Sequence, residues 1–378
     1  MNANFKELFQ PYTFKNGVSI KNRITMPPMT TWASNDDYTI SDEEVAYYER
    51  RVKGVGLVIT GCTRVAANGI GFTHEYASYD DQFIPGLKRL ADAAKSGGAL
   101  AVMQIFHAGN KAVSSLIADH DVVSSSAIVS EKTPFITALE TPRELSEREI
   151  LELIKAFGES TRRAVEAGFD GIEIHGAHGF LLQNFFSPLV NQRTDKWGGS
   201  LENRLRFAVG VVEEIKNVIA RYAAKPFLLG FRISPEEVQE NGLKLKDTYS
   251  LIDKLIELDV DYLHFSLFNI LSQKPINSTD DTPITQVLTS YINNRVPVIA
   301  AGQVSTPEQA GKALELGLSL VGVGHGLVIN PDWVELAQND REHEITDVLV
   351  LSETEILNIP GKLKAIIDQT KGWFKIVQ

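Results

Sequence analysis

Short apolar segments, polar loops and amphipathic segments follow one another along the whole chain. Segments such as Leu57–Ile59 and Ala101–Phe106 are almost entirely apolar, which is typical of strands buried on both faces of a parallel sheet. We predict strands at residues 23–29, 57–65, 100–107, 171–175, 227–234, 262–267, 297–302 and 320–324. Eight strand–helix repeats predict an α/β fold of the (β/α)8 or TIM barrel type, and an open doubly wound sheet is the alternative.

Start and stop signals for helices lie between the predicted strands. Ser41–Glu44, Ser146–Glu149 and Thr306–Gln309 have the capping-box pattern, in which a hydroxyl and a side chain three residues later satisfy free amide groups. Glycines suited to helix ends follow at positions 54, 97, 168 and 317. These signals support a helix after each strand.

The two ends of the chain extend the barrel. Tyr12–Ile20 contains Asn16-Gly17 between apolar positions, which predicts a β-hairpin that caps the amino-terminal end of the barrel. No linker or change in composition divides the chain. We therefore predict one domain over residues 1–378, with the barrel at about 20–340 and a carboxyl-terminal helical extension at 341–378.

Composition narrows the class of protein. The chain has 378 residues, 43% hydrophobic and 22% charged, with a formal net charge of −11, so nucleic acid and anionic membrane surfaces are poor partners. No leader peptide or long apolar segment is evident, which makes the cytoplasm the expected location. The single cysteine, Cys62, excludes an internal disulfide and a cysteine-ligated iron–sulfur cluster.

The segment Gly171–Phe180 carries the strongest indication of a functional site. It predicts a buried strand that ends in His175 and His178, with glycines that allow a ligand to approach closely. Loops that follow the strands form the active site in barrels of this type. Gly322–Gly326 resembles a dinucleotide-binding fingerprint, but we expect no helix directly after it, and alone the motif is weak.

Three longer motifs resemble those of a known family. They are Pro27–Thr30, Gln104–Gly109 and the segment Gly171–Phe207, which ends in Gly-Gly-Ser-x-Glu-Asn-Arg-x-Arg-Phe. The set resembles the old yellow enzyme family of FMN-dependent oxidoreductases, in its bacterial branch. The resemblance extends to about residue 335, and so many fixed positions rarely coincide by chance.

The resemblance implies roles for the matching residues. The expected cofactor-binding residues are Pro27, Pro28, Met29, Thr30, Cys62, Gln104, Arg232, Gly302, Gln303, Gly324 and His325. Thr30 would donate to the flavin O4, Gln104 would match the pyrimidine edge, and Arg232 would stabilise the reduced ring. The catalytic pair would be His175 and His178, which hydrogen-bond the substrate oxygen, and the substrate pocket would be walled by Trp32 and Phe180.

The implied reaction has two half-reactions in one pocket. NADH or NADPH reduces FMN, and a small electron-poor molecule, an α,β-unsaturated carbonyl compound or a quinone, then takes the hydride. No metal is implied. Bacterial relatives often form dimers or tetramers, so a homo-oligomer is a further expectation.

Two positions depart from the family pattern. Phe180 stands where a tyrosine usually protonates the substrate carbon, so we expect quinone reduction to outpace enone reduction. His325 stands where an arginine usually binds the FMN phosphate. If His325 carries part of a charge, FMN affinity should weaken as pH rises from about 6 to 8.

Four other interpretations can be compared with this one. The histidine pair can be a zinc site, although no third ligand stands at a fixed spacing. A dienoyl-CoA reductase or amine dehydrogenase would need clustered cysteines, which the single Cys62 excludes. An aldolase or isomerase would need a lysine or paired carboxylates at strand ends. An FMN-binding barrel with little ene-reductase turnover remains open because Phe180 lacks a proton to donate.

Overall fold

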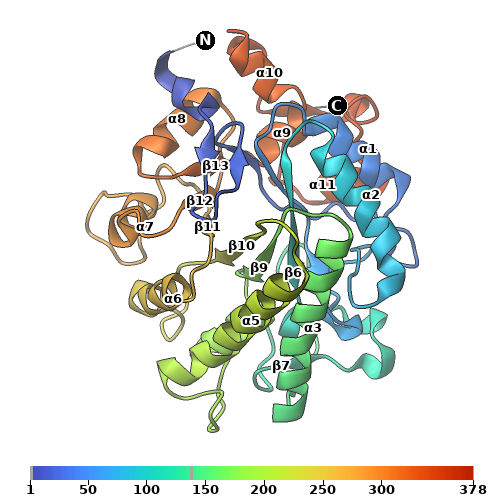
Figure 1. Ribbon diagram of the computed structural model, residues 1–378, viewed down its shortest axis with the longest axis vertical. Helices are drawn as coiled ribbons and strands as arrows, with labels where there is room; N and C mark the ends of the chain where they lie inside the picture. Colours follow the sequence, from blue (N-terminus) through green and yellow to red (C-terminus); the bar gives the residue numbers. More distant parts are fainter. Residues whose placement is uncertain (1–2, 137–138, 378) are drawn as a thin grey trace.

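A closed parallel barrel forms the centre of the protein (Figure 1). The computed structural model describes residues 3–136 and 139–377, so the expected domain limits at 1 and 378 lie outside the described residues. Its strands are β3 (Ile24–Met26), β4 (Leu57–Ile59), β6 (Leu100–Phe106), β9 (Gly171–Gly176), β10 (Leu228–Ile233), β11 (Tyr262–Ser266), β12 (Val298–Ala301) and β13 (Leu320–Gly322). They pair in the order β4-β3-β13-β12-β11-β10-β9-β6, and a β4–β6 pairing closes the ring. The barrel prediction is confirmed, and the open sheet is wrong.

The second predicted strand, 57–65, is interrupted in the structure. β4 ends at Ile59, and β5 (Thr63–Arg64) pairs with β6 and, through a bridge at Arg64, with Ala77. Between them the Gly61 amide donates to the Tyr48 hydroxyl at 2.9 Å, and the Gly61 carbonyl accepts from the Tyr76 hydroxyl at 2.9 Å. Two tyrosine side chains thus replace the strand partners of Gly61, and the chain leaves the barrel wall next to Cys62.

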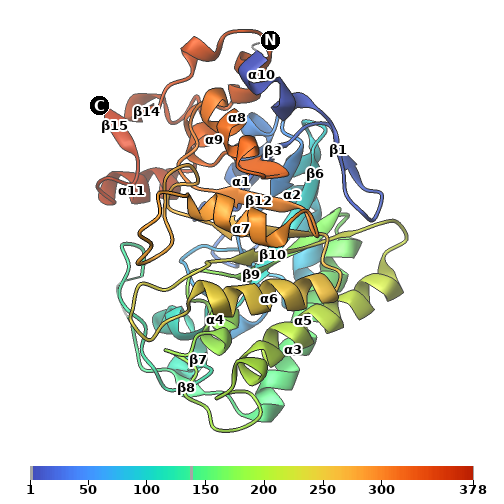
Figure 2. The same ribbon diagram turned by 90° about the vertical axis from the view of Figure 1, so that its left-hand side faces the viewer.

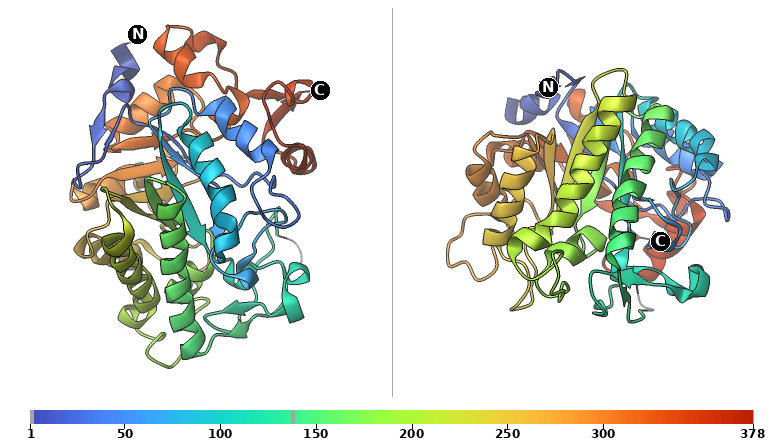
Figure 3. Two further views of the ribbon diagram at one scale, coloured as in Figure 1. Left: turned by 45° about the vertical axis from the view of Figure 1, so that its right-hand side comes forward. Right: turned by 60° about the horizontal axis from the view of Figure 1, so that its bottom comes forward.

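Helices surround the barrel on all sides (Figures 2 and 3). The helices are α1 (Asp42–Arg51), α2 (Ile84–Lys95), α3 (Glu147–Glu166), α4 (Leu181–Phe186), α5 (Leu201–Tyr222), α6 (Leu245–Glu257), α7 (Ile284–Ile292), α8 (Pro307–Glu315), α9 (His325–Ile329) and α10 (Trp333–Gln338). The capping boxes at Ser146 and Thr306 are confirmed. At Ser41 only half of the box forms, because the Glu44 carboxylate accepts from the Thr31 hydroxyl at 2.6 Å instead.

A hairpin closes the amino-terminal end of the barrel, as predicted. β1 (Tyr12–Thr13) and β2 (Ser19–Ile20) are antiparallel, and Gly17 in the turn has a φ of 87°, which suits glycine. Phe14 and Ile20 pack in one apolar cluster with Leu57, Leu228, Tyr262 and Leu320, the first residues of four barrel strands. The hairpin therefore fills the bottom of the barrel and leaves the opposite rim for a ligand.

The carboxyl-terminal extension returns to that rim. It contains β14 (Val348–Val350), α11 (Gly361–Gln369) and β15 (Lys375–Val377), and β14 and β15 pair in parallel. The predicted helical extension is thus correct for α11 only, since the small sheet carries the end of the chain back towards α9 (Figure 2). A kinked seven-residue 3-10 segment, Ala3–Phe9, precedes the hairpin. Short single-turn helices lie in the loops at Ala67–Gly69, Asp81–Phe83, Gly109–Lys111 (η4), Ser114–Leu116, Ala118–His120, Glu342–Glu344 and Leu351–Glu353. The strands β7 (Val123–Ser124) and β8 (Arg143–Glu144) form a separate two-stranded sheet. Among the described residues, no helix has both the length and the apolar character required to cross a bilayer.

Candidate active site

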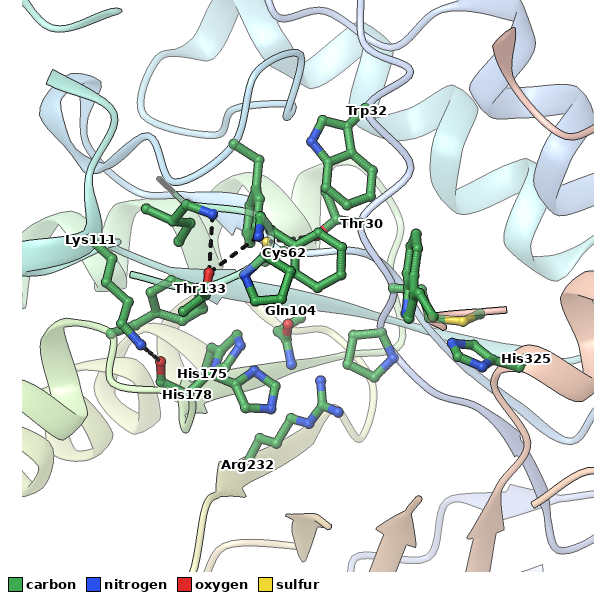
Figure 4. Close-up of a pocket in the computed structure, with 18 residues that line it drawn as sticks. Thr30, Trp32, Cys62, Gln104, Lys111, Thr133, His175, His178, Arg232 and His325 are labelled. Atoms are coloured by element: carbon green, nitrogen blue, oxygen red, sulfur yellow. Dashed lines mark hydrogen bonds between the residues drawn. The ribbon is translucent and has the colours of Figure 1, made fainter. Parts of the chain in front are cut away.

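Every site residue predicted from the sequence lines one of two adjoining cavities at the carboxyl-terminal rim of the barrel. Figure 4 shows the first of them. We call the first, of about 430 Å³, the aromatic cavity, because Trp32, Phe72, Phe135, Phe180 and Trp373 line it. The second, of about 680 Å³, is the polar cavity. Both are lined by Pro28, Met29, Arg232, His325 and Trp373. One ligand with an apolar ring and a polar chain can therefore extend from one cavity into the other.

His175 is the penultimate residue of β9, which ends at Gly176. Its side chain lies in the aromatic cavity beside that of His178. The ring centres are 4.9 Å apart, and the planes are inclined by 77°. The Ala177 amide donates to Nδ1 of His175 at 3.2 Å. In a neutral imidazole this contact places the proton on Nε2, so His175 keeps one N–H group for a ligand.

His178 is held in a backbone conformation that few side chains adopt, with a φ of 60°. Its amide donates to the Ser234 hydroxyl at 3.0 Å, and its carbonyl accepts from the Lys111 ammonium at 2.6 Å. Its Nε2 lies 2.7 Å from the Ser266 hydroxyl, which also accepts from Arg232 at 3.1 Å. Since Ser266 accepts from Arg232, it can donate to Nε2 of His178, which leaves Nδ1–H as the free donor of that ring.

The surroundings of both rings favour the neutral imidazole. Desolvation lowers the pKa of the buried His175 and of His178, which is exposed at the cavity, and the positive charges of Arg232 and Lys111 act in the same direction. Neutral imidazoles can donate hydrogen bonds to an oxygen without first losing a charge. Within the described part of the chain, no third His, Cys, Asp or Glu joins the pair to form a metal-binding group.

A buried polar network lies inside the barrel beneath the cavities. The Gln104 amide donates to one oxygen of Glu173 at 2.7 Å, and Nδ1 of His264 lies 2.9 Å from the other. Burial opposes the charge on Glu173, but His264, Arg232 and Gln104 hold the pKa of this carboxyl below its usual value. Glu173 thereby fixes the Gln104 amide, so the Gln104 carbonyl oxygen stays available to a donor in the cavity.

The sequence reasoning missed Glu173 and His264. The available signal was the polar residue inside each apolar strand, since Glu173 lies between Ile172 and Ile174 and His264 follows Leu263. Such residues are almost always paired when buried. A polar residue inside an apolar strand therefore indicated a buried hydrogen-bond network, although the sequence could not identify the partners of Glu173 and His264.

Arg232 connects the two cavities and has an unsatisfied donor. Its guanidinium is buried and donates to Ser266, but Nε has no partner among the described residues. An unpaired buried N–H group costs about 1–3 kcal/mol. An acceptor atom of a bound molecule would relieve this cost, so Arg232 indicates where the polar edge of a ligand lies.

The polar cavity has the features of a phosphate site. A Cβ on Gly302 would lie 2.5 Å from the carbonyl of Leu267, so only glycine fits there. Gly324 is the N-cap of α9, which begins at His325. Our expectation that no helix follows Gly322–Gly326 was wrong, because a five-residue helix is too short to show a helical repeat in the sequence. Free amides at this turn suit an anion.

His325 is largely covered by aromatic side chains of the carboxyl-terminal extension. Its ring stacks on Phe374 at 4.0 Å and contacts Trp373 at 5.8 Å. Burial lowers the pKa of His325 to about 4, because the ring is covered by the carboxyl-terminal extension. A ring with this pKa is uncharged near neutrality in the absence of a ligand, which argues against the expected weakening of FMN affinity between pH 6 and 8. The sequence could not show that aromatic side chains of the carboxyl-terminal extension cover this ring.

We instead predict that His325 contributes no pH dependence to FMN binding near neutrality. A bound phosphate raises the pKa of His325, so its contribution to affinity is present at low pH and is lost as pH rises through the bound value. Because the free value is about 4, the ratio of FMN dissociation constants for wild type and His325→Gln should stay constant within about twofold between about pH 7 and 8. Fluorescence titration with FMN measures it. A ratio that changes steadily over this range would show a charged His325.

The other predicted residues form the walls. Cys62 is buried, its sulfur lies 3.8 Å from the Thr30 hydroxyl, and burial raises the pKa of the thiol, so it is no nucleophile. Phe180 packs edge-on against His175 at 4.9 Å. Trp32 contacts Phe135 at 5.9 Å. The sequence reasoning missed several wall residues, namely Phe72, Lys111, Thr133, Pro134, Phe135, Ile136 and Trp373, and only Lys111 adjoins a motif that we had identified.

Comparisons with known proteins agree with this geometry. The sequence profile of the NADH:flavin oxidoreductase / NADH oxidase family matches residues 7–344. The chain is 42% identical over 373 residues to the "Probable NADH-dependent flavin oxidoreductase YqiG" of Bacillus subtilis, which covers 99% of each chain. It is 36% identical over 361 residues to the NADH:fumarate oxidoreductase of Klebsiella pneumoniae, covering 95% of this chain but 38% of that protein.

Solved structures show the same fold. Morphinone reductase in complex with tetrahydroNAD has a TM-score of 0.74 and 25% identity, over 88% of this chain and 91% of that one. The old yellow enzyme homologue from Zymomonas mobilis has a TM-score of 0.75 and 24% identity, over 88% of this chain and 93% of that one. At this identity the second match speaks for the barrel alone.

Proposed function

The chain belongs to the NADH:flavin oxidoreductase / NADH oxidase family, as its resemblance to the old yellow enzymes predicted, and we propose that it reduces electron-poor carbonyl compounds or quinones bound by His175 and His178. Membership makes it an FMN-dependent oxidoreductase that takes electrons from NADH or NADPH. The observation that carries the proposal is the pair of neutral imidazoles in a cavity that shares Arg232 with the polar cavity.

The residues present fit FMN. Arg232 offers an unsatisfied buried donor, and Gln104 offers a carbonyl oxygen held in place by Glu173. Gly302 and Gly324 line the polar cavity, where the phosphate would lie. Bound FMN supplies hydride transfer, and the protein's share is to bind, orient and polarise.

The histidine pair would act on the acceptor's oxygen. Nε2–H of His175 and Nδ1–H of His178 donate to a carbonyl oxygen, on which negative charge develops as the double bond is reduced. Apolar walls around the pair exclude water and strengthen both hydrogen bonds. Neither ring needs to change its protonation state during this step.

The same cavity would receive the nicotinamide of the reductant. Morphinone reductase, whose fold this chain shares, has been solved with tetrahydroNAD, and the aromatic cavity here adjoins the polar cavity along its Arg232 side. We infer that reductant and acceptor occupy the aromatic cavity in turn. This arrangement predicts ping-pong kinetics. It also predicts that the reductant and the acceptor each inhibit the other's binding when present at high concentration.

Phe180 should make the rates of reduction differ between two classes of acceptor, enones and quinones. It lines the cavity beside His175 but has no proton to donate, so enones, which need a proton on carbon, should react more slowly than quinones. Phe180→Tyr should raise the enone rate by about 10²-fold, within the usual range for a general acid, and leave the quinone rate within about threefold. Stopped-flow reoxidation with matched acceptors measures both. An enone rate unchanged in Phe180→Tyr would favour the second candidate, a barrel that binds FMN but reduces few enones.

Anaerobic mixing tests the proposed function directly. The purified protein should be yellow, should bleach on addition of NADH or NADPH, and should regain its colour when a quinone is added. Separate dissociation constants for the two nucleotides would identify the preferred reductant. A protein that binds no flavin, or that keeps its colour with both nucleotides, would contradict the proposal.

A further inference from the structure

Lys111 places a positive charge in the aromatic cavity that none of the roles above requires. It ends the turn η4, directly after β6, and its side chain reaches across to the loop after β9 (Figure 4). The ammonium donates to the carbonyl of His178 at 2.6 Å and lies 5.9 Å from the centre of the Phe180 ring. It therefore lies beside both the acceptor-binding histidine and the position of the missing tyrosine.

This cation forms no ion pair within the described chain. No Asp or Glu lies within ion-pair distance of Lys111, and the side chains that line the aromatic cavity include neither. Glu237 and Glu131 act on the Lys111 ammonium from outside the cavity, and the Glu237 oxygens accept from Gln183 at 2.8 Å and Ser187 at 2.6 Å. Lys111 thus retains donors that no neighbouring carboxylate uses.

The other ionisable side chains of the cavity either have a partner or are uncharged. Arg232 donates to Ser266 and lies near the buried Glu173 carboxylate. His175 and His178 are neutral, and so is His325 near pH 7. Since burial disfavours an unpaired ammonium and lowers the pKa of Lys111, an anion beside it would recover part of that cost.

We propose that Lys111 is a specificity residue that selects acceptors carrying a carboxylate, with the reducible carbonyl group on His175 and His178 and the carboxylate on the ammonium. Apolar walls strengthen the ion pair relative to one at the surface. The inference rests on the proposed function for the identity of the acceptor. The binding of an anion at Lys111 can be tested without any turnover.

The test uses 4-oxo-2-pentenoate and its methyl ester, which lacks the negative charge but has a more reactive double bond. The effect of each variant is therefore measured against wild type on the same acceptor. Lys111→Met should lower kcat/KM for the acid by about 10- to 100-fold, which is the usual effect of losing a hydrogen bond to a charged group. The same variant should change kcat/KM for the ester by less than about threefold. Lys111→Arg keeps the cation and should retain most of the wild-type kcat/KM for the acid. An equal loss for acid and ester would show that Lys111 only supports the His178 backbone and would overturn the proposal.

A binding experiment separates this proposal from the proposed function. Calorimetric titration of the FMN-loaded protein with benzoate and with benzamide needs no electron transfer. Lys111→Met should raise the dissociation constant of benzoate by about 10-fold or more and leave that of benzamide unchanged. This result is expected even if the protein reduces no enone. Equal affinity of wild type and Lys111→Met for benzoate would overturn the proposal while leaving the proposed function intact.

A nucleotide phosphate is the competing anion. NADH carries phosphates, whereas 1-benzyl-1,4-dihydronicotinamide carries none, so their rates of flavin reduction distinguish the two sources. We expect Lys111→Met to affect both reductants equally. A loss confined to NADH, with the wild-type kcat/KM for the acid retained, would assign Lys111 to the nucleotide and contradict the proposal.

Discussion

Replacing both His175 and His178 with alanine should slow the reduction of an enone by at least about 10²-fold, the cost commonly measured when one preorganised donor to a developing oxyanion is lost. Both imidazoles are neutral donors in the aromatic cavity, and no other side chain offers an N–H pair at this position in the described structure. FMN should remain bound, since its expected contacts lie elsewhere. Stopped-flow reoxidation of the reduced protein measures the effect.

Two controls accompany this prediction. His175→Gln and His178→Asn each keep an N–H donor and should retain more activity than the alanine variants. The wild-type rate should also stay flat between about pH 6 and 8, because the pKa of each ring lies well below 6.5 and no protonation change occurs in that range. A rate that falls steadily with rising pH would require a charged imidazole and would contradict the assigned role.

Replacing Arg232 with methionine should lower the midpoint potential of bound FMN by about 30 to 60 mV. A hydrogen bond from a charged group contributes about 1.5–3 kcal/mol, and about 1.4 kcal/mol corresponds to 30 mV for a two-electron couple. Arg232 is buried between the two cavities and retains an unpaired Nε–H group. Its loss should destabilise negative charge on the reduced ring, and redox titration measures the shift.

The same variant should weaken the fold, which requires a matched control. Removal of Arg232 takes away a positive charge that helps to stabilise the buried Glu173 carboxylate, although the ion-pair partner of Glu173 is His264. Glu173→Gln in the Arg232→Met background should restore most of the lost stability to thermal unfolding. Arg232→Lys keeps the charge and should shift the potential less. A potential unchanged in Arg232→Met would place the flavin edge away from this residue.

Much of the barrel could be predicted because its strands are buried on both faces. Continuous apolar segments such as Leu100–Phe106 have no other common explanation when they recur between helices. The end of the second strand could not be predicted, because Tyr48 and Tyr76 come from other parts of the chain to bind Gly61. Local pattern determines where a strand can begin, and tertiary hydrogen bonds decide where it ends.

Site residues at strand ends could be predicted from the sequence. Site residues that come from segments far away in the sequence could not. His175, Gln104 and Arg232 lie at or near strand ends, so the topology alone brings them together. Trp373 and Phe374 reach the rim through a two-stranded sheet that no sequence period indicated. The contact of Phe374 with the His325 ring helps to bury that ring and so lowers its pKa, which the sequence alone could not show.

The central claim is that the two cavities hold one flavin, with the histidine pair on its reactive face, and a crystallographic map of the yellow protein tests it most directly. We predict density for a planar tricyclic ring beside Gln104 and Arg232, with a phosphate near Gly302 and Gly324 and both imidazoles facing the ring. A metal ion bound by His175 and His178, or a ring that lies outside both cavities, would contradict the account.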